Sequence, residues 1–302
     1  MAALYPRSID SVLDDPGLVR RLVEQNEPYY PVQRYFRNDA EYASSTGTEH
    51  MIIAPNFRGD WAYDEPLVEG VEPLLYHQGF IDAARAMYDT EYVRPQQVYC
   101  NLTWQLPFPQ GPGHTDVPAF RGVDRTRYPT MLLSLMGQSG LFEPWRIHIV
   151  TAVAWFYRGS DGGLDYWPEG ADGPRHVHEG QIFNTAIVGD NDFMFHRVRP
   201  VGRREDGLPG PMTLETRLTR KGGDEWQLLE ADSVLGEPKY DDLRISISWK
   251  ANVSPEDGEK IDIDQVFESF RADGIDVPTD PLNSPDLFRA LTEAYSWRSP
   301  EA

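Results

Sequence analysis

The chain has 302 residues, a length that favours one large domain over two independent ones. Its 28 Lys and Arg residues stand against 48 Asp and Glu residues, and the formal net charge of −20 argues against nonspecific binding to nucleic acid or anionic membranes. The 40% hydrophobic share excludes a chain that is disordered throughout, and the single cysteine, Cys100, excludes an internal disulfide or a cysteine-rich metal site.

The N-terminal residues lack the basic start and long apolar run of a signal peptide. The most apolar stretch, Ile147 to Tyr157, is too short to span a membrane. We therefore expect a cytoplasmic protein with neither nucleic acid nor membrane as a partner. The aromatic-rich interior favours a small-molecule substrate.

The first third of the chain predicts helices and an arm. Residues 9–26 have helical spacing, with Leu18 and Leu22 on one face. Residues 27–65 are rich in aromatic and turn-forming residues, which predicts a long arm with little regular structure. Helical periodicity returns over 66–88, in two pieces that break near Pro73 and Gly79.

From residue 97 onward the pattern becomes that of β-strands. Short alternating or apolar runs between turn signals predict strands at residues 97–106, 147–157, 163–167, 181–188, 193–198, 212–218, 226–231 and 243–253. Helices are expected at residues 128–137, 262–273 and 285–297. This order predicts an α+β protein with a mainly β core, a sandwich or barrel, in one structural domain: an N-terminal part (1–96), the core (97–253) and C-terminal helices (254–302).

His114 and Asp116 form a His-x-Asp motif directly after the first predicted core strand and a turn rich in Pro and Gly. Residues i and i+2 of an extended segment point the same way, so one imidazole and one carboxylate can converge on a metal ion. A pair that stabilises a turn is the alternative.

His196 follows a Gly/Asp/Asn turn and stands at the far end of a short apolar strand. Two histidines and one carboxylate leave open positions on a metal, as a non-haem Fe(II) site for O₂ and a chelating co-substrate requires. A histidine that simply closes a strand is the alternative.

Arg244 begins a strand in which it shares one face with Ser246 and Ser248, while Ile245, Ile247 and Trp249 share the other. A guanidinium beside a serine hydroxyl suits a carboxylate. An arginine on a solvent-facing strand surface is the alternative.

A rival metal site lies at His176-Val177-His178-Glu179, which is similar to the His-x-His…Glu pattern of cupins. The glutamate follows too closely for that pattern, so an exposed turn explains these residues better.

In order and type, these elements resemble the Fe(II)/2-oxoglutarate-dependent dioxygenase superfamily. Its members carry His-x-Asp, a distal His and an Arg-x-Ser strand, and the run from Gly162 to Pro168 is similar to a Gly-Gly-x-Leu strand found in many of them. The resemblance covers roughly residues 97–253 and implies a double-stranded β-helix (a jelly-roll or cupin-like core) with flanking N- and C-terminal helices.

The resemblance implies that His114, Asp116 and His196 bind Fe(II), and that Arg244 with Ser246 binds 2-oxoglutarate. The gap between His196 and Arg244 is long for the family. We interpret residues 202–240 as an inserted hairpin, in which 212–218 pairs with 226–231, and we keep Arg199 and Arg203 as fallback candidates for the co-substrate anchor.

A carboxylate at position 116 implies hydroxylation or a related oxidation of an unactivated C–H bond rather than chlorination, with release of succinate and CO₂. Trp104, Trp167 and Arg121 are candidate substrate contacts, and the 27–65 arm and the 202–240 hairpin are candidate lids. The alternatives are a non-catalytic cupin-like protein that binds a metal or ligand, and a metal-dependent enzyme that does not use 2-oxoglutarate.

Overall fold

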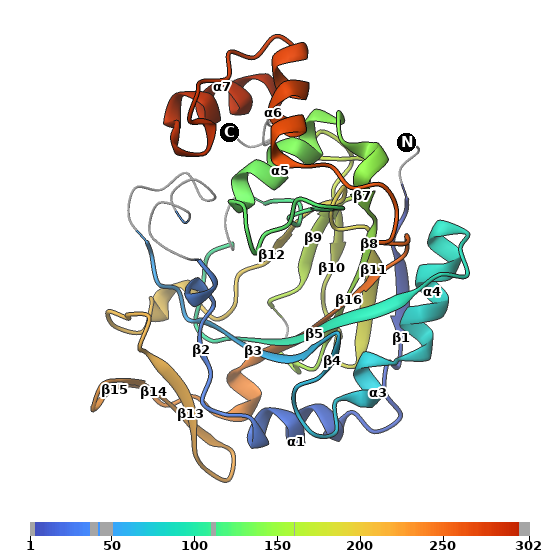
Figure 1. Ribbon diagram of the computed structural model, residues 1–302. Coiled ribbons are helices and arrows are strands. Elements are labelled where there is room, and N and C mark those ends of the chain that lie inside the picture. Colours follow the sequence, from blue (N-terminus) through green and yellow to red (C-terminus); the bar gives the residue numbers. More distant parts are fainter. Residues whose placement is uncertain (1–3, 37–41, 43–50, 110–112, 160, 296–302) are drawn as a thin grey trace.

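A computed structural model describes residues 4–36, 42, 51–109, 113–159 and 161–295. Its dominant element is an eight-stranded sheet, and every strand pair among the described residues is antiparallel. Figure 1 shows this sheet crossing the middle of the molecule. Its strands, in spatial order, are β1 (Arg7–Asp10), β11 (Thr185–Gly189), β8 (Ile149–Trp155), β16 (Arg244–Asn252), β5 (Arg94–Thr103), β3 (Asn56–Tyr63) and β2 (Tyr30–Pro31), with β4 (Glu65–Pro66) paired to β3.

Smaller sheets complete the β structure. They consist of β10 (His176–His178), β9 (Leu164–Trp167) and β12 (Phe195–Val198); of β13 (Arg217–Gly222), β14 (Glu225–Glu230) and β15 (Ser233–Gly236); and of β6 (Ala119–Phe120) with β7 (Arg146–Ile147).

The helices are few and short. They are α1 (Gly17–Gln25), α3 (Glu72–Leu75), α4 (Gln78–Tyr88), α5 (Thr130–Ser139), α6 (Ile263–Ala272) and α7 (Pro285–Tyr295), with 3₁₀ turns at Val32–Tyr35, Glu143–Trp145, Arg204–Asp206, Tyr240–Asp242 and Pro281–Asn283. Among the described residues, no helix has both the length and the apolar character that crossing a membrane requires.

The two faces of the large sheet differ in chemistry because side chains alternate along each strand. On β16, Ile245, Ile247 and Trp249 are fully buried and belong to the main apolar core, which α1, α3 and α4 cover. The Trp249 indole N–H donates to the carbonyl of Leu75 at 2.8 Å, which ties the sheet to α3. The opposite face carries Arg244, Ser246, Ser248 and Lys250, and it is therefore the polar face that positions the candidate site.

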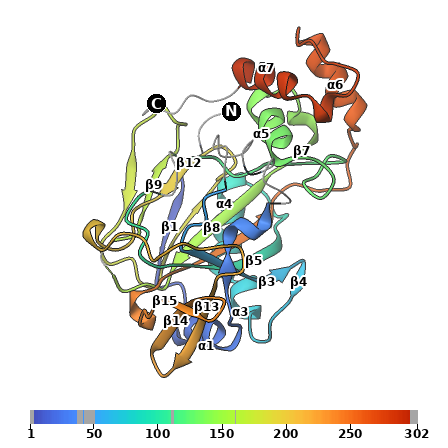
Figure 2. The ribbon, with the colours of Figure 1, turned by 90° about the vertical axis from the view of Figure 1, so that its left-hand side faces the viewer.

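A second apolar cluster lies apart from the main core. It joins α5, α6 and α7 around fully buried aromatic residues such as Phe142 and Phe270, whose rings meet edge to face at 5.2 Å. Both views show these helices together at one end of the molecule (Figures 1 and 2). The C-terminal helices are thus packed on α5 rather than on the large sheet.

Most predicted elements of the core are observed within a few residues of their expected bounds. The predicted inserted hairpin is present as β13 and β14, paired with Leu218 opposite Leu228, and the structure adds β15 as a third strand. The mainly β character is confirmed.

The prediction for the N-terminal third was partly wrong. Residues 27–65 were expected to have little regular structure, but they contribute β2 and β3, and β3 pairs with β5 inside the large sheet. The first helix begins only at Gly17, because Arg7–Asp10 form an edge strand on β11. Part of the expected arm, residues 37–41 and 43–50, lies outside the described residues.

Candidate metal centre

Backbone hydrogen bonds bring the candidate metal ligands together. His114 and Asp116 lie between β5 and β6, and His196 lies on β12. The amide of His114 donates to the carbonyl of His196, and the amide of His196 donates to the carbonyl of His114, each at 2.9 Å. The amide of Asp116 donates to the carbonyl of Asn191 at 2.8 Å. The two chain segments are therefore aligned by main-chain contacts.

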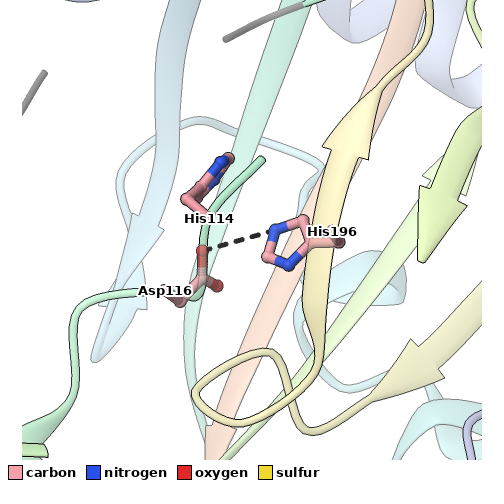
Figure 3. A group of neighbouring side chains, drawn as sticks. All are labelled: His114, Asp116 and His196. Carbon is pink, nitrogen blue, oxygen red and sulfur yellow. Dashed lines mark ion pairs between the residues drawn. The ribbon is translucent and has the colours of Figure 1, made fainter. Parts of the chain in front are cut away.

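The three side chains converge on one point (Figure 3). One ligand atom of each lies within 4.8 Å of the others, and His196 Nε2 is 3.8 Å from Asp116 Oδ1. The two imidazole rings have centroids 4.6 Å apart. Two imidazoles and one carboxylate arranged on one side of a point form a donor set that suits iron and leaves coordination positions open.

The orientation of His196 favours metal binding. Its Nδ1 is 2.9 Å from the carbonyl oxygen of Met194, and because a carbonyl can only accept, Nδ1 carries the proton and Nε2 keeps its lone pair. This is the arrangement usual for metal-binding histidines. Of the three candidate ligands, His114 is exposed to solvent, Asp116 is half-buried and His196 is buried. Desolvation and the neighbouring His196 lower the pKa of His114 to about 4, so its ring is neutral at neutral pH, as a ligand must be.

Asp116 is held from the side opposite the histidines. Lys250 Nζ is 2.6 Å from Asp116 Oδ2, and the Thr151 hydroxyl donates to the same oxygen at 3.5 Å. Thr151 on β8 and Lys250 on β16 are directly paired in the sheet, so their side chains reach Asp116 side by side. Burial alone would raise the pKa of Asp116, but Lys250 and the two imidazoles hold it below its usual range. Oδ1 remains directed at His196, available to a metal.

These contacts connect two sheets through the site. His196 belongs to the three-stranded sheet, whereas Lys250 and Thr151 belong to the polar face of the eight-stranded sheet. Asp116 is in contact with both. The candidate metal centre therefore lies where the polar face of the large sheet meets β12.

Arg244 stands on the same face of β16 as Lys250. Its guanidinium is buried, donates to the carbonyl of Gly162 through Nε and to the Ser246 hydroxyl through Nη1 at 2.9 Å, and has no hydrogen-bond acceptor for Nη2 among the described residues. Burial lowers its pKa to about 10, so it remains a cation at neutral pH. A buried guanidinium with an unused donor suits a carboxylate ligand.

The fallback arginines are engaged elsewhere. Arg199 forms ion pairs with Asp165 and Glu179, each at 3.0 Å, and Arg203 pairs at the surface with Asp206. Both therefore already have carboxylate partners, in contrast to Arg244.

The candidate substrate contacts are dispersed. Trp104 lines a cavity of about 770 Å³, which none of the three candidate metal ligands lines. Trp167 is buried against Phe195, with the ring centroids 5.5 Å apart. Arg121 donates to the carbonyls of Glu259 and Pro144, beside the α5–α7 cluster. The structure does not bring these three side chains together at the candidate metal centre.

His176–His178 form strand β10, so the expectation of a turn was wrong, although Val177 and Glu179 are exposed as expected. The pairing of β10 with β9 explains the strand, because His176 stacks on Tyr166 at 5.4 Å and His178 Nε2 lies 2.9 Å from the Thr185 hydroxyl. Among the described residues, His114, Asp116 and His196 form the group that brings metal-ligating atoms together, and these histidines are not part of it.

Lys250 and Asp192 were not among the residues predicted from the sequence. The alternation that places Arg244, Ser246 and Ser248 on one face of β16 also places Lys250 there. Extending the same alternation by two residues would therefore have predicted its position. Asp192 is 7% exposed. It lies in a Gly/Asp/Asn turn, a composition typical of solvent-exposed loops, and local sequence carries no sign of its burial.

No protein-family model and no curated protein matches the sequence. The structure resembles solved structures, among them an oxidoreductase of the 2OG-Fe(II) oxygenase family from Burkholderia pseudomallei (13% identity, 82% of this chain and 85% of that chain, TM-score 0.44). Another is the alpha-ketoglutarate-dependent epimerase SnoN from nogalamycin biosynthesis (12% identity, 93% of this chain and 89% of that chain, TM-score 0.44). A third is HygX from Streptomyces hygroscopicus with nickel and 2-oxoglutarate bound (11% identity, 83% of this chain and 84% of that chain, TM-score 0.41).

The first of these structures carries the name of the family that the sequence motifs resemble. Likenesses at such identities and TM-scores do not assign the chain to a family. The chemistry of the site therefore rests on its own residues.

Proposed function

We propose that this protein is an Fe(II)- and 2-oxoglutarate-dependent oxygenase that hydroxylates, or otherwise oxidises, a C–H bond of a small organic molecule. His114, Asp116 and His196 would hold the iron, and Arg244 with Ser246 would hold the distal carboxylate of 2-oxoglutarate. The double-stranded β-helix belongs to this proposal, with the large sheet and the β9–β10–β12 sheet as its two halves.

The observation that carries the proposal is the combination of two features on one polar face. Three ligand atoms of the non-haem iron type lie within 4.8 Å of one another. On the same face of the sheet, the buried Arg244 has an Nη2 donor without a partner among the described residues. A metal alone explains only the first feature, whereas a metal together with an anionic co-substrate explains both.

Each residue has a distinct task in this scheme. The bound iron with 2-oxoglutarate and O₂ supplies the oxidising chemistry. His196 presents Nε2 because Met194 fixes its tautomer, and Lys250 leaves Asp116 one oxygen for coordination. Arg244 neutralises and orients the far end of the co-substrate, in a position shielded from water.

The direct test combines spectroscopy with product analysis. Anaerobic Fe(II) and 2-oxoglutarate together should give the wild-type protein a weak visible charge-transfer band, and His114→Ala should lack it. Arg244→Ala should still bind Mn(II) but lose most of its affinity for 2-oxoglutarate, by about tenfold or more, because a charge-assisted pair is removed.

Two outcomes would reject the proposal. One is a wild-type protein that shows no band and forms no succinate in air with a broad panel of substrates, which would favour a non-catalytic metal- or ligand-binding protein. The other is normal turnover by Arg244→Ala, which would favour a metal-dependent enzyme that does not use 2-oxoglutarate.

A further inference from the structure

The turn that leads into β12 carries buried acidic residues next to the candidate metal centre. Asp190, Asn191 and Asp192 are each less than one-tenth exposed. The amides of Phe193 and Met194 donate to the carbonyl of Asp190 at 3.1 and 2.7 Å, which closes the turn. The carbonyl of Asn191 accepts the amide of Asp116, so the turn is anchored to one metal ligand and runs into another, His196.

The carboxylates of this turn lack the partners that buried acids normally have. Neither oxygen of Asp192 has a hydrogen-bond partner among the described residues. Asp190 is better supplied: its Oδ2 accepts a hydrogen bond from the Tyr88 hydroxyl, and the backbone amides of Asp192 and Phe193 also stabilise its carboxylate, although its Oδ1 has no well-formed hydrogen bond among the described residues. Burial of a carboxylate without hydrogen-bond donors is energetically unfavourable, so such groups are rare unless something else binds them.

The nearby cations are already committed. Lys250 is paired with Asp116 at 2.6 Å. Arg146 is paired with Glu143 at 2.8 Å and donates to the Gly137 carbonyl at 3.0 Å, although its Nη1 has no acceptor. Within the described part of the chain, the carboxylates of Asp190 and Asp192 therefore have only the Arg146 guanidinium nearby as a further cation, and Arg146 is already paired with Glu143.

The electrostatics of Asp192 agree with this account. Burial and the neighbouring Asp190 raise its pKa well above the usual range. Lys250 acts in the opposite direction, and Asp116 raises the pKa further. The Asp192 carboxyl therefore lies within electrostatic reach of the metal ligand Asp116.

We propose that Asp192, supported by Asp190, binds a cationic group of the substrate, a protonated amine or a guanidinium, beside the metal centre. Such a group offers several N–H donors and a positive charge to the unused oxygens, and it pairs strongly because water is excluded. A divalent metal fits less well, because Ca²⁺ and Mg²⁺ need six or more oxygen ligands. The catalytic meaning of this inference rests on the proposed function, whereas the cation site itself can be measured without turnover.

The experiment uses butylammonium as the probe and 1-butanol as its uncharged counterpart. Protein loaded with Mn(II) and 2-oxoglutarate is titrated with each, and paramagnetic relaxation of the probe's methylene protons is followed by NMR. We expect butylammonium to bind at least tenfold more tightly than 1-butanol. Asp192→Asn should lose this preference, Asp190→Asn should weaken it, and Asp64→Asn, which removes a surface charge paired with Arg94, should keep it.

The proposal is overturned if both probes bind equally to the wild-type protein or if neither binds. It is also overturned if a folded Asp192→Asn protein retains the preference. Should Asp192→Asn fail to fold, Asp192→Ser provides the same comparison. Mn(II) and 2-oxoglutarate binding are measured in the same samples; if they fail, the proposed function fails, and the cation site is then tested by probe chemical shifts in metal-free protein.

Discussion

Among single residues, Lys250 has the most direct influence on the candidate metal centre. Its ammonium and the carboxylate of Asp116 are both largely buried, with side chains 14% and 18% exposed. A buried ion pair stabilises little as a whole, but removal of one partner leaves an uncompensated charge. Lys250 therefore both neutralises Asp116 in the metal-free protein and fixes which oxygen faces the histidines.

We predict that Lys250→Met lowers the free energy of unfolding of the metal-free protein by about 3 kcal/mol, the lower end of the range for a broken buried pair. Lys250→Arg, which keeps the charge, should lose less. Urea unfolding with and without Mn(II) measures this, and Mn(II) should restore part of the loss because the metal replaces the missing cation. Equal stability of Lys250→Met and wild type would contradict the role assigned to Lys250.

At the scale of elements, the Gly189–Met194 turn makes stability depend on pH. Burial raises the pKa of Asp190 to about 6, against the opposing effects of Tyr88 and Arg146. Between its ordinary pKa and this value the folded state binds more protons than the unfolded state. The free energy of unfolding must therefore fall as the pH rises through this window.

We predict that the metal-free protein loses on the order of 2 to 3 kcal/mol from this turn as the pH rises from about 4 to above 6. Asp190→Asn cannot ionise at this position. The difference in free energy of unfolding between Asp190→Asn and wild type should therefore favour the variant more at pH 7.5 than at pH 4.5. Denaturant unfolding at the two pH values measures the difference, with Asp64→Asn as the exposed control. A difference that does not change with pH would show that Asp190 does not titrate in this way.

At the scale of the whole molecule, two large apolar clusters contain most of the buried apolar residues, and two small clusters lie around Trp155 and Trp167. The main core joins the large sheet to α1, α3 and α4, and the second joins α5, α6 and α7. The candidate metal centre is built from β8, β12, β16 and the segment that follows β5. The metal ligands therefore depend on the large sheet more directly than on the C-terminal helices.

We predict that Phe270→Ala, at a fully buried position of the second cluster, costs about 3 to 5 kcal/mol of local stability. Hydrogen exchange should become faster in α5, α6 and α7 while β5, β8 and β16 remain protected. Mn(II) affinity should stay within about twofold of wild type, because no metal ligand lies in this cluster. Loss of Mn(II) binding together with exchange in the large sheet would instead indicate one cooperative unit.

The sequence predicts the core strands because apolar alternation is a local signal. The grouping of His114 and Asp116 with the distant His196 was expected only through the resemblance to the dioxygenase superfamily. Strand β3 was missed for a physical reason. Its Arg58 and Asp60 face the polar side of the sheet, where they pair with each other and Arg58 stacks on the rings of Tyr35 and Tyr99. Polar residues that line an interior site have the same period-two pattern as residues that face solvent.

The contact between Lys250 and Asp116 could not be predicted for another reason. It joins residues 134 positions apart in the sequence, and it depends on how two sheets meet. The alternation on β16 shows the face on which Lys250 lies, but not what that face opposes. Contacts of this kind follow from topology, which a single sequence specifies only through the whole fold.

The reciprocal bonds between His114 and His196 have a consequence for genetic dissection of the site. They join peptide groups and involve no side-chain atom. Replacement of either imidazole therefore removes a ligand without removing the bridge that aligns the two segments. A variant such as His114→Ala should be an intact protein with one donor missing, and its loss of metal then reports on coordination and not on collapse of the surrounding chain.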